Sequence, residues 1–209
     1  MVSVVLKNIF LDILEKYSDD KEYNLLCWND IEKNYSDEHR YYHNLNHLFS
    51  IYSEIINLQG FIKEYDVFIF TLFYHDIVYE PLRNDNEKLS ALKFEEVISH
   101  TTFSQIENVK EMIEATKYHE YSDKEDINIF LDCDLLILGS SDQKYKEYMN
   151  NIRKEFYIYP DNIYAAGRIK VLEHFLSLPF IYKTPYFKQY EANAVKNITS
   201  EINYLKKSI

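Results

Sequence analysis

Two histidines four positions apart are the first residues in this sequence whose type and spacing could do chemistry. His43 and His47 lie in the segment RYYHNLNHL. We expect a helix to start near Arg40, and residues four apart on a helix project from the same face. Two imidazoles at this spacing suit a metal ion, or one metal ligand with a proton donor beside it. With seven histidines in 209 residues, a pair of surface or hydrogen-bonded histidines is the competing interpretation.

Acidic residues inside apolar segments give the second signal. His75 and Asp76 interrupt the run FTLFYHDIVY, and Asp132 and Asp134 interrupt the run LDCDLLIL. A buried carboxylate is unfavourable without a cation or hydrogen-bond donors, so Asp76 needs a metal ion, an ion pair or a hydrogen bond across helices. Asp132 and Asp134 are two residues apart and diverge on a helix. At most one of them is therefore expected to share a site with His75 and Asp76.

These residues, in this order, resemble a known signature. His47, the pair His75-Asp76 and Asp134 look like the H…HD…D pattern of the HD superfamily of metal-dependent phosphohydrolases. The run YHNLNH is similar to the YHNxxH motif of cyclic-nucleotide phosphodiesterases, which belong to the same superfamily. Five ordered segments also resemble a bacterial family of predicted HD phosphohydrolases of unassigned substrate, and they span about Arg40 to Leu176: RYYHNLNHL, FYHDIVYEP, DNEKLSA, LDCDLLILG and GRIKVLEHFL.

The resemblance implies a role for each matching residue. One divalent metal ion, which could be Mn, Fe, Ni, Co, Mg or Zn, would be held by His47, His75, Asp76 and Asp134. The segment Cys133-Asp134-Leu135 looks like the one that carries the last ligand in the phosphodiesterases, so Asp134 is preferred to Asp132. No third histidine closely follows His75-Asp76, and this departure from the phosphodiesterase pattern favours one metal ion over two.

The remaining roles concern the reaction. The resemblance implies that His43 protonates the leaving oxygen, that Glu87 orients the attacking water, and that His119 binds a second metal or the substrate. Candidate substrate-binding residues are Arg40, Asn86 and Arg168. The two arginines are candidates because guanidinium groups pair with phosphate in a bidentate manner. Surface or structural ion pairs are the alternative role for each arginine.

The function that follows is a metal-dependent phosphohydrolase acting on a nucleotide or another small phosphate ester. A metal with open coordination positions lowers the pKa of bound water and polarises a phosphoryl oxygen. Two alternatives belong to other classes. One is an iron oxygenase of the HD type, and the other is a non-catalytic protein that binds a metal or a nucleotide.

The elements that must position these residues are predicted to be helices. The sequence has only 3 Gly and 4 Pro, too few for the turns of a multi-stranded sheet. Apolar residues recur at helical spacing almost throughout. We expect about ten helices in an all-α bundle, including helices from about Arg40 to Gly60, from Tyr65 to Tyr79 as a buried central helix, from Ser104 to His119 and from Asp126 to Leu138. The 65–79 segment is also rich enough in β-branched and aromatic residues to suit a strand.

Composition limits the partners and the location. The net charge of −11 is spread along the chain, and without clustered Lys and Arg a duplex nucleic acid partner is not expected. Two cysteines without CxxC spacing fit a reducing compartment. No run of about 18 apolar residues or basic leader is present, so a cytoplasmic protein without a membrane partner is expected. We expect one domain over 1–209, with the metal-site core at about 40–140 and the helices of 141–209 packing on it.

Overall fold

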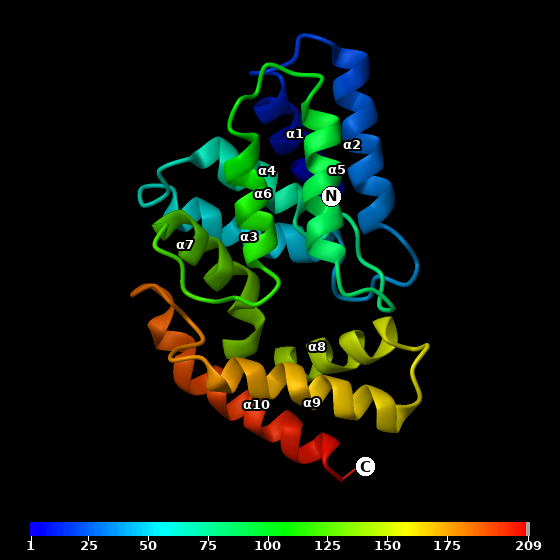
Figure 1. Ribbon diagram of the computed structural model, residues 1–209, viewed down its shortest axis with the longest axis vertical. Helices are drawn as coiled ribbons and strands as arrows, with labels where there is room; N and C mark the ends of the chain where they lie inside the picture. Colours follow the sequence, from blue (N-terminus) through cyan, green and yellow to red (C-terminus); the bar gives the residue numbers. More distant parts are fainter. Residues whose placement is uncertain (208–209) are drawn as a thin grey trace. The chain divides into compact units, whose positions relative to one another are not determined.

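The chain is built from helices alone in the part that the structure describes. The computed structural model describes residues 1–207, and this part contains ten α-helices, two 3₁₀ helices and no strand (Figure 1). The prediction of an all-α fold with about ten helices is confirmed, and the strand alternative for 65–79 is wrong. The α-helices are α1 (Val2–Leu14), α2 (Lys21–Tyr35), α3 (Leu45–Leu58), α4 (Tyr65–Tyr74), α5 (Asn86–Ile98), α6 (Ile106–Ala115), α7 (Glu125–Asp134), α8 (Asp142–Glu155), α9 (Asp161–Ser177) and α10 (Glu191–Leu205); the 3₁₀ helices are η1 (Leu135–Gly139) and η2 (Phe187–Tyr190).

Two compact units divide the chain. The first comprises Met1–His119 and the second Glu120–Ile209. The division falls between His119 and Glu120, and the metal-site core expected at about 40–140 stays a prediction. Whether the two units form one domain, as expected from the sequence, stays a prediction.

Helix α4 forms the core of the first unit. Every residue from Val67 to Tyr74 is buried, and α4 contacts α1, α3, α5 and α6. Aromatic rings fill the space between these helices: Phe73 lies edge-on to Phe10 with centroids 5.1 Å apart, and Tyr74 lies edge-on to Phe94 at 5.2 Å. Burial of this many large apolar side chains is the main stabilising contribution. The prediction of a buried central helix is confirmed.

Helix α3 begins five residues later than the sequence predicts. The segment 40–44 is an irregular loop, and the helix starts at Leu45. Asn44 is the reason: its side chain accepts a hydrogen bond from the Asn46 amide and donates two to the carbonyls of Arg40 and Tyr41. Asparagine at such a position caps the helix and offers the preceding backbone a partner other than the helix. His43 and His47 are therefore not on one helix, and that premise was wrong.

Helices α4 and α6 end earlier than predicted. Helix α4 ends at Tyr74, so His75 and Asp76 lie in the turn that follows it and not inside an apolar helix. Helix α6 ends at Ala115, which leaves His119 outside it. His119 has a φ of 51°, the left-handed conformation that rarely suits a residue with a Cβ atom.

The second unit contains α7 to α10 with the two 3₁₀ helices. The predicted helix from Asp126 to Leu138 divides into α7 and η1, which ends at Gly139. The Gly139 amide donates to the Tyr182 hydroxyl at 2.9 Å, and this hydroxyl donates to the Leu135 carbonyl at 3.0 Å. Helices α9 and α10 are joined by a buried ion pair between Arg168 Nε and Glu201 Oε1, 2.9 Å apart. Across residues 1–207, every helix is too short or too polar to cross a membrane.

Candidate metal centre

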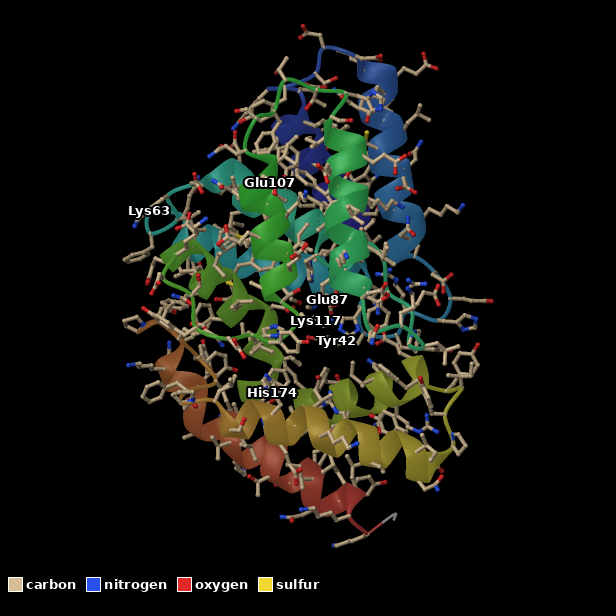
Figure 2. The ribbon with its side chains drawn as sticks, in the orientation of Figure 1. Tyr42, Lys63, Glu87, Glu107, Lys117 and His174 are labelled. Carbon is tan, nitrogen blue, oxygen red and sulfur yellow. The ribbon has the colours of Figure 1, made fainter. Side chains whose placement is uncertain are left out.

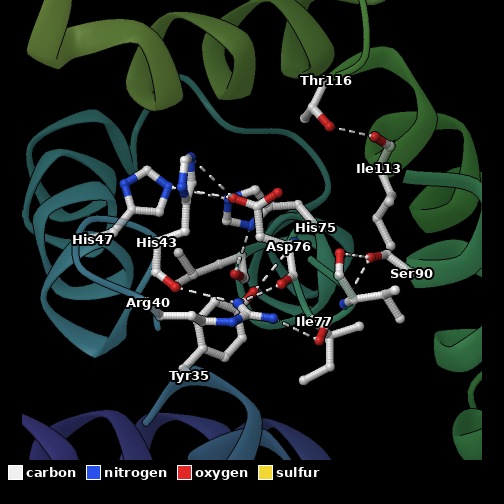
Figure 3. A network of polar contacts seen from close by, with 12 residues as sticks. Tyr35, Arg40, His43, His47, His75, Asp76, Ile77, Ser90, Ile113 and Thr116 are labelled. Carbon is white, nitrogen blue, oxygen red and sulfur yellow. Dashed lines mark hydrogen bonds and ion pairs between the residues drawn. The ribbon is translucent and has the colours of Figure 1, made fainter. Parts of the chain in front are cut away.

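Two buried imidazoles and a carboxylate meet in the first unit (Figure 3). His47 comes from the first turns of α3, and His75-Asp76 follow α4. His47 Nε2 lies 3.2 Å from His75 Nε2, and His75 Nε2 lies 3.2 Å from Asp76 Oδ2. His47 Nε2 is 3.9 Å from the same carboxylate oxygen. This His/His/Asp group is of a kind that could hold a metal ion.

The backbone fixes which nitrogen of His75 faces the group. His75 Nδ1 lies 3.0 Å from the Leu72 carbonyl oxygen. A carbonyl only accepts hydrogen bonds, so Nδ1 carries a proton and Nε2 is the nitrogen left to act as a ligand. Metal-binding histidines commonly donate their other ring N–H to a carbonyl in this way. His75 therefore presents Nε2 to the centre with the correct tautomer.

The spacing of the three atoms fits a single cation. A point equidistant from His47 Nε2, His75 Nε2 and Asp76 Oδ2, given their three separations, lies about 2.0 Å from each, and metal–nitrogen and metal–oxygen bonds measure about 2.0 to 2.2 Å. Lone pairs on His47 Nε2, His75 Nε2 and the Asp76 carboxylate repel one another unless a cation or a hydrogen-bonding proton lies among them. A metal ion or a proton on one imidazole meets this need.

His43 adds a third imidazole on a more exposed side. Its Nε2 lies 4.0 Å from Asp76 Oδ2, and its ring centroid lies 5.6 Å from that of His47. The side chains of His43 and Asp76 are each 19% exposed, whereas those of His47 and His75 are 3% and 0% exposed. The sequence correctly predicted that His43 and His47 are neighbours, although a loop and not a shared helix face brings His43 there. Solvent therefore reaches this group on the side of His43 and Asp76.

Arg40 lies beneath the group and contacts backbone carbonyls. Its Nη1 donates to the carbonyls of Asp76 at 2.7 Å and His43 at 3.2 Å, and its Nη2 donates to the carbonyl of Ile77 at 3.0 Å. The guanidinium also lies over the ring of Tyr35, at 4.8 Å from its centroid. Both terminal nitrogens therefore serve the protein's own backbone, an arrangement unlike the phosphate-binding role predicted for Arg40.

Asn86 and Glu87 begin α5 in the same unit. The Asn86 side chain makes two hydrogen bonds with the backbone of Glu80 and so closes the loop between them. Glu87 is partly exposed in the first turn of α5. Figure 2 shows Glu87 and Tyr42 at the lower end of this unit, and Glu107 higher up in the same view. His119 is buried at the end of the unit, and its predicted role in binding a second metal or substrate stays a prediction.

Asp132 and Asp134, the two alternative ligands that the sequence offered, have different surroundings in the second unit. Asp132 is fully buried, and its carboxylate accepts hydrogen bonds from the amides of Lys183 and Thr184 and from the Thr184 hydroxyl, at 2.7 to 3.0 Å. Burial raises the pKa of Asp132, and these donors oppose the rise. Asp132 thus anchors the loop at 183–184, which accounts for its burial without a metal. Asp134, the last residue of α7, is partly exposed.

Arg168 is also engaged within the second unit. It is 8% exposed, pairs with Glu201 and donates from Nη2 to the Tyr148 hydroxyl at 3.0 Å. Arg153 binds Asp161 and two backbone carbonyls. These contacts match the ion-pair alternative, and a phosphate-binding role for Arg168 has no support from its surroundings.

Two supporting residues of the centre were missed by sequence reasoning. The Tyr35 hydroxyl accepts a hydrogen bond from the Asp76 amide at 3.2 Å, and the ring of Tyr79 packs on that of His43 with centroids 4.3 Å apart. Twenty tyrosines in the chain gave no signal that singled these two out. Only their position in the fold does.

Comparison with known proteins adds no relative to this picture. No family model, no curated protein and no solved structure matches the chain.

Proposed function

We propose that this chain is a metal-dependent phosphohydrolase that acts on a nucleotide or another small phosphate ester. The observation that carries the proposal is the meeting of His47, His75 and Asp76 at ligand spacing, with His43 beside them on the exposed side. The order of these residues in the chain supports membership of the HD superfamily. Asp134 is proposed as a further ligand from that resemblance.

Each residue of the first unit would have a distinct role. His47, His75 and Asp76 would hold the cation, and the His75–Leu72 contact selects the neutral tautomer in which Nε2 carries the lone pair that a ligand needs. When bound, the metal supplies an activated water and polarises a phosphoryl oxygen. His43 is well placed to hold a proton for the leaving oxygen, because it lies on the solvent side of Asp76. Glu87 would orient the attacking water.

The negative charge of the chain favours a substrate that is bound through a cation. The chain carries a net charge of −11, and the arginines predicted to bind phosphate, Arg40 and Arg168, are committed to other groups. A divalent ion would supply the positive charge that a phosphate ester needs. The cytoplasmic location belongs to the same proposal, and it is supported by two buried cysteines, Cys27 and Cys133, that are not joined in a disulfide.

The test is metal analysis followed by turnover. Protein purified without chelator is expected to contain about one divalent ion per chain, and with Mn, Co or Ni it is expected to hydrolyse at least one member of a panel of phosphomonoesters and phosphodiesters. His47→Ala and Asp76→Asn are expected to lose the metal and at least about 100-fold in turnover while keeping helical content. His39→Ala is the control, because the His39 side chain is 53% exposed.

Three results would redirect the proposal. A chain that binds metal and a nucleotide tightly without turnover is a binding protein. Two irons per chain with oxygen consumption would indicate an oxygenase. A wild-type protein that binds no metal would leave the hydrogen bond between His47 and His75 as the explanation of the cluster, and the hydrolase proposal would fail.

A further inference from the structure

Arg40 joins two segments that are far apart in the sequence. It belongs to the loop that carries His43, and its guanidinium bonds the carbonyls of Asp76 and Ile77, which lie 36 and 37 residues away along the chain. The same Nη1 that reaches Asp76 also reaches the His43 carbonyl. One planar group thus ties the loop of residues 40–44 to the turn of residues 75–78 (Figure 3).

Aromatic rings hold this guanidinium in place. Its carbon lies 4.8 Å from the ring centroid of Tyr35 and 5.5 Å from that of Tyr79. Tyr35 also accepts from the Asp76 amide, and Tyr79 packs on His43. Tyr35 therefore contacts the backbone of Asp76, and Tyr79 contacts the side chain of His43. These are the two residues on the exposed side of the candidate metal centre.

We propose that Arg40 is a positioning residue that fixes the distance between His43 and Asp76 by locking their two backbone segments together. The inference rests on the proposed function for its chemical meaning. The separation of 4.0 Å between His43 Nε2 and Asp76 Oδ2 depends on two segments that no shared helix holds in register. Arginine suits this task because its planar fork can bond several carbonyls in fixed directions and stack on rings, which a lysine ammonium cannot do.

This role differs measurably from phosphate binding. A phosphate-binding Arg40 would affect substrate affinity, would leave metal affinity unchanged without substrate, and would be replaced in part by lysine. A positioning Arg40 acts before any substrate binds. Arg40→Lys keeps the charge but removes the fork, so it separates the two roles and disturbs folding less than Arg40→Ala does.

Two measurements on the full chain test the lock. In the metal-free protein, backbone amide exchange by mass spectrometry is expected to quicken at least about fivefold in residues 41–47 and 75–79 of Arg40→Lys, with helices α9 and α10 unchanged. Calorimetric titration with Mn²⁺ alone is expected to show a 10- to 100-fold loss of affinity, the range typical of residues that support metal ligands. Arg83→Lys is the matched control, because Arg83 pairs with Asp85 at the surface of the same unit.

Unchanged exchange in both segments of Arg40→Lys would overturn the lock, whatever the metal result. Quickened exchange with unchanged Mn²⁺ affinity would overturn its role at the centre. If the wild-type protein itself binds no Mn²⁺, Zn²⁺ or Co²⁺, the proposed function fails, and the exchange result still decides whether Arg40 locks the two segments.

Discussion

At the scale of single residues, the histidines of the candidate centre differ in their exposure to solvent. His47 and His75 are almost wholly enclosed, whereas His43 retains contact with solvent. A ligand gains from enclosure because water competes for the metal, and a proton donor needs access to the leaving group. His43 is therefore expected to serve turnover and not metal retention.

His43→Gln tests this division. The variant keeps a polar side chain of similar size but cannot carry a titrating proton. Under the proposed function, kcat is expected to fall about 10²- to 10⁴-fold, and Mn²⁺ affinity is expected to stay within about threefold of the wild type because the three closer ligand atoms remain. Steady-state kinetics and calorimetry measure the two quantities. A parallel loss of metal would show that His43 is itself a ligand.

At the scale of elements, the sequence predicted which segments are helical better than where they end. Helical spacing and scarce glycine indicated ten helices, and the apolar run at 67–74 indicated the buried position of α4. The ends depend on single side chains: Asn44 caps α3 and bonds the loop before it, and His75 bonds the Leu72 carbonyl as α4 finishes. Residue types do not reveal such contacts, since each requires the backbone to be in place first.

The candidate site was predictable to a similar degree. The sequence indicated His43, His47, His75 and Asp76 as one group, and the structure brings them together. The role of Arg40 was not predictable, because its partners are backbone carbonyls of a distant turn. Carbonyls are the same in every residue, and no sequence pattern marks them.

Replacing glycine by alanine is expected to change the free energy of unfolding in opposite directions at two positions of the second unit. A Cβ atom at Gly139, where η1 ends, would lie 2.6 Å from Tyr190 Cβ and 2.8 Å from the Tyr182 hydroxyl, whereas one at Gly167 in α9 meets nothing within 4 Å. Gly139→Ala is expected to lower the free energy of unfolding by about 1 to 3 kcal/mol through overpacking. Gly167→Ala is expected to raise it by about 0.5 to 1 kcal/mol, because alanine favours the helix. Urea unfolding measures both, and equal effects would contradict the packing at Gly139.

At the scale of the whole molecule, the predicted ligands divide between the two units. His47, His75 and Asp76 belong to the first, and Asp134 belongs to the second. Thermal unfolding can tell a metal ligand from a residue that only stabilises the fold. A metal that binds only the folded state raises the stability of the protein by about 2.7 kcal/mol at 100 times Kd. Loss of a ligand such as Asp134 would remove this gain, whereas loss of Asp132 would lower the stability of the metal-free protein.

Asp132→Ala and Asp134→Ala are expected to separate these two effects. Asp132→Ala is expected to lose about 2 to 4 kcal/mol of stability, because buried donors of Lys183 and Thr184 lose their acceptor, and to keep the rise in Tm that Mn²⁺ causes. Asp134→Ala is expected to keep the metal-free Tm and to lose most of that rise. The reverse pattern, with the metal-induced rise lost only in Asp132→Ala, would make Asp132 the ligand.

The contact between His75 and the Leu72 carbonyl has a consequence for redesign of the protein. His75 follows the last residue of α4, and its imidazole directs Nε2 toward the candidate centre. Under the proposed function, a substitution at this position would alter helix termination and metal binding together. His47 lies within α3, where the Asn44 cap is independent of its side chain. An engineer who wants a folded, metal-free form should therefore substitute His47, and natural variants that abandon the metal would be expected to change that histidine before His75.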